Sequence, residues 1–292
     1  MGPLEIATGY EGSNPQDAAD VERLGEAAFC VRPESEDGDS VYKFNCDVTV
    51  ENAGPGPAEL TLTLDWQEPP EVGDRHMDAR TSLFVSSGGD WREHVGRTEA
   101  DRATFQLTVP PGSTRLCVAP PFGSAELEAF FGRALKLPSA RRFCFGQTAE
   151  GRLMEAAVLG STERTELCVV AIGTVHPYER GGSHFVDGIV DLLADQRGQG
   201  LRRTVGFVLA PMANPDGVAH GYCKRTTTGC ELSSEGGRSS DPTACSLRGL
   251  LAGVAAAAPR CGFIDAHNWM HRYDGLFTYS PGLAAKLEPT YT

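Results

Sequence analysis

The sequence predicts an α/β protein in two parts. An antiparallel β-sandwich is expected over residues 1–125, and a domain with a mixed, mostly parallel sheet over residues 126–292. Between about residues 40 and 118, apolar and polar residues alternate, which is typical of strands with one buried face. After residue 126, continuous apolar runs are separated by stretches of helical periodicity, which indicates strands covered by helices on both faces.

Three alternating runs define the first part. Their apolar positions are Phe44, Cys46, Val48 and Val50, then Leu60, Leu62, Leu64 and Trp66, and finally Phe105, Leu107 and Val109. Segments rich in Gly, Pro and Ser separate these runs, at 52–57, 86–90 and 110–112. Short strands with such turns favour a sandwich. Adhesive and carbohydrate-binding modules also use this fold, so it does not by itself specify a function.

The second part alternates between strands and helices. Buried strands are predicted at 167–172, 205–209 and 262–266, and helices at 125–135, 185–193 and 247–257. A polar stretch rich in Gly, Ser and Thr, at 221–246, precedes the last helix. This order of elements is the signature of an α/β domain.

Composition narrows the class of function. The formal net charge is −13 and the isoelectric point is near 5.0, which disfavours a nucleic-acid partner because phosphate binding draws on clustered Lys and Arg. No apolar run approaches the ~20 residues of a membrane span, and the N-terminus lacks a signal-peptide pattern. We therefore expect a cytoplasmic protein without a membrane partner.

The nine cysteines are odd in number and scattered, and several lie in apolar runs, so they are predicted to be buried free thiols. Cys223 and Cys230 could in principle bind zinc together with Cys245. Their spacing fits no paired-cysteine zinc motif, which makes this the weaker alternative.

A stronger candidate for a metal site follows the first buried strand of the second part. Residues 176–179 read HPYE, so His176 and Glu179 lie three positions apart and can converge on one cation. Catalytic zinc sites use three protein ligands, and His267 ends the third predicted strand, at the sheet edge where α/β proteins place their sites. A capped turn or a surface ion pair is the alternative explanation for an isolated HxxE.

Several motifs resemble one family. Residues 174–179 (TVHPYE) resemble an HPxE motif whose His and Glu bind zinc, and residues 211–218 (PMANPDGV) match a PMxNPDGV segment. Residues 263–267 (FIDAH) resemble the strand that ends in the third zinc ligand, and residues 276–279 (LFTY) the next strand. The chain thus resembles the zinc metallocarboxypeptidase superfamily, most closely its cytosolic carboxypeptidase branch, in which a small sandwich precedes the peptidase domain.

The resemblance implies a cofactor and a substrate. One Zn²⁺ ion would be held by His176, Glu179 and His267. The implied reaction is hydrolysis of C-terminal residues from peptides or proteins, with glutamate from acidic tails as the implied substrate. Glu231 stands where the family often has the Asp or Asn that fixes the first zinc-binding ring, although it could equally be a solvated loop carboxylate.

Residues 222–234 resemble the family's substrate-binding loop. Lys224 and Arg225 are the candidates for the positive charge that the family supplies there as Arg. Ser233 and Ser234 replace the Asn-Arg pair that grips the substrate's terminal carboxylate. This replacement predicts that the carboxylate anchor is lost, and with it much of the reason for exopeptidase selectivity, because Ser lacks the planar fork of Arg.

The family's general-base Glu lies well beyond the third ligand, whereas this sequence ends 25 residues after His267 (292 − 267). Asp274 and Glu288 are poor candidates for this base, so the catalytic residue stays unknown and the carboxypeptidase-like domain is expected to be incomplete. Three hypotheses follow: an active zinc carboxypeptidase, an inactive zinc-binding pseudoenzyme or interaction protein, and a fragment of an active enzyme.

Overall fold

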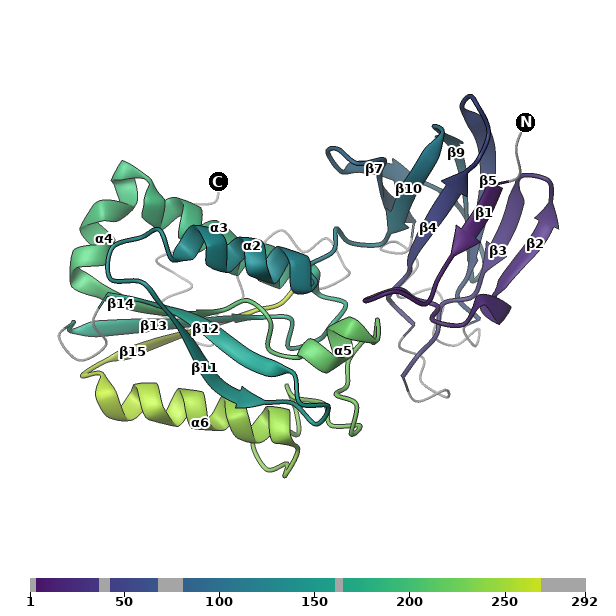
Figure 1. Cartoon of the computed structure of the whole chain (residues 1–292). Helices are drawn as coiled ribbons and strands as arrows, with labels where there is room; N and C mark the ends of the chain where they lie inside the picture. The colour runs from purple at the N-terminus through teal and green to yellow at the C-terminus, as the bar shows by residue number, and fades with distance from the viewer. Residues whose placement is uncertain (1–3, 37–42, 68–80, 161–164, 269–292) are drawn as a thin grey trace.

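The computed structural model describes residues 4–36, 43–67, 81–160 and 165–268. Two five-stranded sheets use strands from the first 117 residues, and a third sheet uses strands from residues 141–266 (Figure 1). The predicted combination of an N-terminal sandwich with an α/β sheet is confirmed. The division at residue 125 stays a prediction. The proposed strand at 276–279 and the carboxylates of Asp274 and Glu288 lie outside the described residues.

The N-terminal region contains two stacked sheets. The first has the order β1 (Leu4–Ala7), β4 (Asp47–Asn52), β10 (Gly112–Cys117), β6 (Ser82–Ser86) and β7 (Arg92–Val95), with every pairing antiparallel. The second has the order β2 (Val21–Gly25), β3 (Ala28–Val31), β5 (Ala58–Asp65), β9 (Arg102–Val109) and β8 (Arg97–Glu99), and its β3–β5 pairing is parallel. A short 3₁₀ helix, η1 (Ala18–Asp20), precedes β2.

The alternating pattern explains this sandwich. In β5 and β9 every second side chain is buried, and these side chains meet those of β4 and β10 in one apolar core. Trp66, Leu62 and Phe105 are among the largest side chains in that core.

The third sheet is mixed. Its order is β11 (Arg141–Gln147), β12 (Leu153–Leu159), β14 (Val205–Ala210), β13 (Leu167–Gly173) and β15 (Cys261–Ala266). The pairings of β13 with β14 and with β15 are parallel, while β11–β12 and β12–β14 are antiparallel. The parallel strands are the three predicted from their apolar runs, and β11 and β12 are additions to that prediction.

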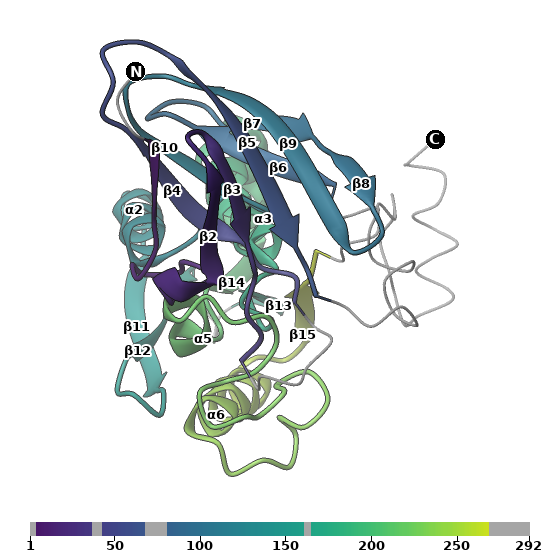
Figure 2. The same ribbon diagram turned by 90° about the vertical axis from the view of Figure 1, so that its right-hand side faces the viewer.

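Helices cover both faces of this sheet. α2 (Ser124–Ala134) and α3 (Arg180–Ala194) pack on one face and α6 (Pro242–Ala257) on the other, each with its own apolar core (Figure 1). Shorter helical segments are η3 (Gln196–Gly198), α4 (Gln199–Thr204) and α5 (Pro215–Ala219). Figure 2 shows the same arrangement from the side of the N-terminal sheets. The Gly12 N–H, in the segment after β1, donates to the Ala219 carbonyl of α5 at 2.8 Å. Among the described residues, no helix is both long and apolar enough to cross a membrane.

Candidate metal centre

A sharp turn follows strand β13. Thr174 has a φ of 47°, in the left-handed region that a β-branched residue rarely adopts, and its hydroxyl donates to the Pro211 carbonyl at 3.2 Å. The Gly173 carbonyl accepts a hydrogen bond from the Ala213 N–H at 2.9 Å. Such strain persists only where the surroundings enforce it, and it is common at functional sites. The turn carries His176 and Glu179 across the carboxyl edge of the sheet.

His267 reaches the same edge from a neighbouring strand. The parallel register places Gly173 opposite Ala266, so the chain leaves β13 and β15 side by side. Helix α3 begins directly over this point, and a Cβ atom on Gly182 would lie 1.8 Å from the Ala266 carbonyl oxygen. Glycine at 182 therefore permits the close approach that brings Glu179, the N-cap of α3, next to His267.

His176, Glu179 and His267 form one cluster. Their ligand atoms all lie within 4.8 Å of one another. One oxygen of Glu179 lies 2.9 Å from His176 Nδ1, and the other lies 2.6 Å from His267 Nδ1. Glu179 and His176 are buried, whereas the His267 side chain is 29% exposed. One flank of the cluster therefore remains open to solvent.

The cluster fits a zinc ion. Ligands at about 2.1 Å from a tetrahedral ion lie roughly 3.4 Å apart, which falls between the shortest and longest separations in the cluster. Two imidazole nitrogens and a carboxylate oxygen are also ligands that zinc accepts. Within the described parts of the chain, no second group of three His, Cys, Asp or Glu residues meets the same distance criterion.

Outer contacts orient both rings. Ser233 donates its hydroxyl proton to Glu231 at 3.2 Å, so it can accept from His176 Nε2, which lies 3.1 Å away. His267 Nε2 lies 3.1 Å from the Asp265 carboxylate. With a proton on each Nε2, both rings present the lone pair of Nδ1 to the centre, as metal-binding histidines require.

The sequence predicted one of the residues that make these outer contacts. Glu231 does lie near His176, with its carboxylate 3.7 Å from Nε2, although Ser233 makes the shorter contact. Asp265 was missed. Its signal was its position two residues before His267, since residues i and i+2 of a strand point to the same face.

The protonation of the cluster follows from these contacts. Burial would raise the pKa of Glu179, but hydrogen bonds from His176 and His267 outweigh it and lower this pKa to about 2. Burial would lower the pKa of His267, but its contacts with Asp265 and Glu179 dominate and raise the value to about 10. Without a cation, the cluster thus holds an ionised carboxylate and a protonated His267.

The two predicted substrate-binding residues differ in position. Lys224 is buried, and its Nζ lies 3.9 Å from the same Glu231 oxygen that approaches His176. Arg225 turns toward its own loop, where it donates to the Gly229 carbonyl at 2.8 Å and lies 3.8 Å from Glu235. Lys224 is therefore the one that shares a partner with the candidate centre.

The PMANPDGV segment supports this loop. Asn214 caps α5 by accepting from the Gly217 N–H at 3.0 Å, and its amide donates to the Arg225 carbonyl at 3.1 Å. Asp216 is buried and bonds Thr148 at 2.7 Å and Arg152 at 2.8 Å. Burial would raise the pKa of Asp216, yet its hydrogen bonds lower it. The motif thus fixes the backbone beside Lys224.

The cysteines do not form a second centre among the described residues. All nine are free, and six of them are buried, as predicted, whereas Cys144, Cys245 and Cys261 are exposed. Cys223 accepts a hydrogen bond from the Phe44 N–H at 3.1 Å.

The chain is similar to known proteins over part of its length. Residues 134–241 match the family model described as zinc carboxypeptidase, a stretch that contains His176 and Glu179. Cytosolic carboxypeptidase 6 of Caenorhabditis elegans is 29% identical over 122 residues, which are 40% of this chain and 27% of that protein. Cytosolic carboxypeptidase 6 of Mus musculus is 35% identical over 94 residues, which are 30% of this chain and 17% of that protein.

The fold has solved counterparts. The crystal structure of a putative carboxypeptidase from Burkholderia mallei superposes with a TM-score of 0.78 at 20% identity, covering 99% of this chain and 76% of that one. The fold is therefore similar to that of this putative carboxypeptidase, and the clustered residues form a candidate metal centre within it. The chain is thus similar to zinc carboxypeptidases over residues 134–241, and its matches span about a quarter or less of the length of the two curated relatives.

Proposed function

We propose that His176 Nδ1, the Glu179 carboxylate and His267 Nδ1 hold one zinc ion, and that this centre serves hydrolysis of C-terminal residues from peptides or proteins. The observation that carries the proposal is the convergence of these three residues within 4.8 Å at the carboxyl edge of the third sheet. The zinc carboxypeptidase match over residues 134–241 supports it. Zinc in such a site polarises a carbonyl and lowers the pKa of bound water toward neutrality.

The chain's own residues have separate roles. Ser233 and Glu231 hold the His176 ring, and Asp265 holds the His267 ring, so both imidazoles are oriented before the ion binds. Lys224 supplies positive charge beside Glu231, at the position where the family stabilises a developing oxyanion. The residue that takes the proton from water stays unassigned.

The substrate and compartment belong to the same proposal. The names of the relatives support a cytoplasmic peptidase that acts on peptide or protein C-termini. Glutamate from acidic tails is the substrate residue that we propose, and Lys224, which lies 3.9 Å from Glu231, is the basic group proposed to attract it. The region over residues 1–125 is proposed to be a separate sandwich domain.

A second candidate is a zinc-binding protein without peptidase activity, which could serve as an interaction protein. The observation that favours it is the use of Ser233, whose hydroxyl holds the His176 ring at a position where the family grips substrate. Ser234, beside it, offers no guanidinium for a terminal carboxylate.

One experiment separates the two candidates. The full chain is loaded with zinc, the metal is quantified by mass spectrometry, and release of glutamate from peptides ending in Glu is followed with and without a chelator. Chelator-sensitive release, lost together with zinc in His267→Ala, supports the peptidase. Zinc bound at about one ion per chain without any release supports the second candidate. Full zinc occupancy in His267→Ala refutes the proposed ligand set.

A further inference from the structure

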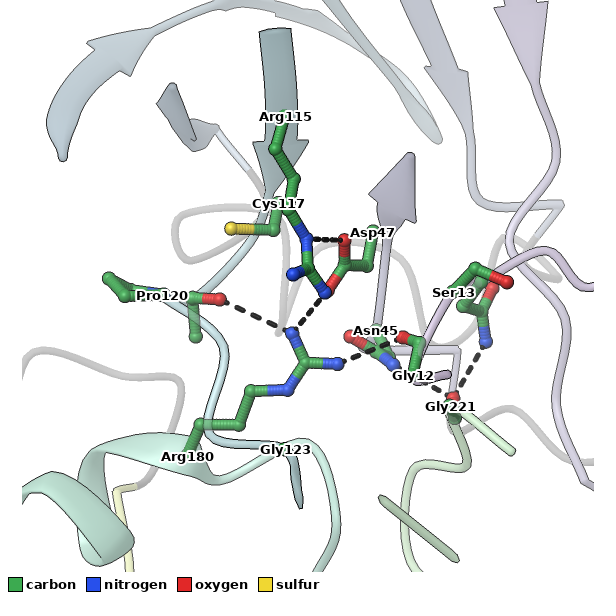
Figure 3. Close-up of polar contacts among 12 residues, drawn as sticks. Gly12, Ser13, Asn45, Asp47, Arg115, Cys117, Pro120, Gly123, Arg180 and Gly221 are labelled. Atoms are coloured by element: carbon green, nitrogen blue, oxygen red, sulfur yellow. Dashed lines mark hydrogen bonds and ion pairs between the residues drawn. The ribbon is translucent and has the colours of Figure 1, made fainter. Parts of the chain in front are cut away.

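The residue after Glu179 joins the metal-bearing helix to the N-terminal sheets. Arg180 is the first residue of α3 and is 2% exposed. Its guanidinium donates to the Asp47 carboxylate at 2.6 Å and to the Gly12 carbonyl at 3.0 Å (Figure 3). It also donates to the Ala119 carbonyl at 3.4 Å. All of these acceptors belong to the first 119 residues, so the start of α3 is held from outside its own sheet.

Asp47 is itself fixed from the N-terminal side. Its carboxylate accepts two hydrogen bonds from Arg115, at 2.8 and 2.9 Å, and one from the Tyr10 hydroxyl at 3.0 Å. Asp47 is fully buried on the first strand position of β4. Charge-assisted and bidentate bonds of this kind have strict geometry, so the position of Asp47 is transmitted to Arg180.

A second contact reaches the loop that carries Lys224. The Glu36 carboxylate accepts hydrogen bonds from three consecutive backbone N–H groups, those of Cys223 at 3.0 Å, Lys224 at 2.7 Å and Arg225 at 2.8 Å. One side chain from the N-terminal region thus sets the backbone course of the loop beside the candidate centre.

Further contacts support the same loop. Asn14 and Asn45 both donate to the Gly221 carbonyl, at 3.0 and 2.8 Å. Phe44 packs against Tyr178 in a tilted arrangement with ring centroids 5.5 Å apart, and Tyr178 lies between His176 and Glu179 in sequence. The contacts from the N-terminal region therefore meet both the metal-binding turn and the substrate-loop candidate.

We propose that the N-terminal region positions the candidate metal centre, with Asp47 acting through Arg180 and Glu36 acting through the backbone at 223–225 as positioning residues. This inference rests on the proposed zinc site. The reason is geometric: Glu179 and Arg180 are adjacent at the start of α3, so a rotation that releases Arg180 from Asp47 also moves the Glu179 carboxylate relative to His267. Metal affinity depends on such orientation of ligands by outer contacts.

The test uses the full chain and two readouts. Zinc affinity is measured by competition with a chromophoric chelator, and the visible spectrum of the Co²⁺-substituted protein reports ligand geometry. We expect Asp47→Asn and Glu36→Gln each to weaken zinc binding by about tenfold, the lower end of the range for outer contacts, and to change the Co²⁺ spectrum. Asp65→Asn is the control, because it removes a buried carboxylate whose partner, the largely exposed Arg102, also lies inside the N-terminal sheets.

A double variant separates positioning from stability. Asp47→Asn combined with Arg180→Met removes both charges of the buried pair, so no uncompensated Arg180 charge remains at this contact. We expect its zinc affinity to stay about tenfold weaker than that of the unmodified chain, even where its thermal stability recovers. Zinc affinity that returns with stability would overturn the proposal.

Two other outcomes are decisive. Unchanged zinc affinity and an unchanged Co²⁺ spectrum in both Asp47→Asn and Glu36→Gln would also overturn it. Should the Asp47 variant fail to fold, Glu36→Gln alone decides. Failure of the unmodified chain to bind either ion would refute the proposed zinc site, and the positioning role with it.

Discussion

The two halves of the candidate centre are built differently. His176 and Glu179 are buried in one turn between β13 and α3, and they lie inside the zinc carboxypeptidase match. His267 follows β15, a strand paired only with β13 within the described residues, and its side chain is partly exposed. The first half is held by contacts from several elements, whereas the second depends on Asp265 and Glu179. The difference suggests a preformed half and a more adjustable half.

The largest effect is expected from the buried half. Glu179→Ala removes the carboxylate that contacts both imidazoles, so zinc affinity should fall by more than about 100-fold, beyond the range for outer contacts. Isothermal titration with zinc measures the change. Glu166→Ala, an exposed carboxylate at 88% side-chain exposure, is the control and should bind as the unmodified chain does. Comparable zinc affinity in the Glu179 variant would remove this residue from the centre.

The adjustable half should govern the pH dependence. The folded, metal-free chain raises the pKa of His267 to about 10 from an ordinary value of 6.5. Zinc must therefore displace a proton, and its apparent affinity should rise about tenfold per pH unit between pH 7 and 9. Zinc titrations over this range test the slope. A flat profile would contradict the raised pKa of His267, and His220→Ala, at a surface histidine bound to Glu150, should keep the slope.

The raised pKa of His267 also predicts how the stability of the metal-free chain depends on pH. Because the folded state binds the His267 proton more tightly than the unfolded state, this contribution is fully present below pH 6.5 and is lost as pH rises toward 10. Denaturant unfolding in the presence of a chelator measures it. His267→Ala should remove this part of the pH dependence, and a dependence that survives in that variant must come from another group.

The smallest effects should separate the outer contacts of the two halves. Asp265→Asn weakens the support of the exposed ring and should reduce zinc affinity by about tenfold. Ser233→Ala should cost less, because Glu231 lies 3.7 Å from His176 Nε2 and can take over as acceptor. Competition with a chelator ranks the two variants. A larger loss of zinc affinity in Ser233→Ala than in Asp265→Asn would contradict the interpretation that the buried half is preformed.

The sequence predicted the elements with strong periodicity. The apolar runs of β13, β14 and β15 located the parallel part of the third sheet, because strands covered on both faces are almost continuously apolar in sequence. β11 and β12 were missed. β11 is largely exposed, begins with two Arg residues and contains a bulge between Cys144 and Gly146, so its alternation is broken.

The start of α3 was also missed. The helix was predicted from Phe185 onward but begins at Arg180, since the glycines at 181 and 182 resemble a loop while permitting contact with β15. The three candidate ligands were predicted from motif spacing. The sequence did not predict the contacts of Arg180, Asp47 and Glu36, because partners more than 100 positions apart leave no periodic signal.

The central claim is that two imidazoles and one carboxylate share a single zinc ion. X-ray absorption spectroscopy at the zinc edge, on the full chain loaded with one equivalent of zinc, tests it most directly. The account predicts only nitrogen and oxygen neighbours at about 2.0–2.2 Å, with the outer-shell scattering typical of two imidazoles, and loss of one imidazole in His267→Ala. Sulfur neighbours at about 2.3 Å, or a spectrum unchanged in that variant, would contradict it.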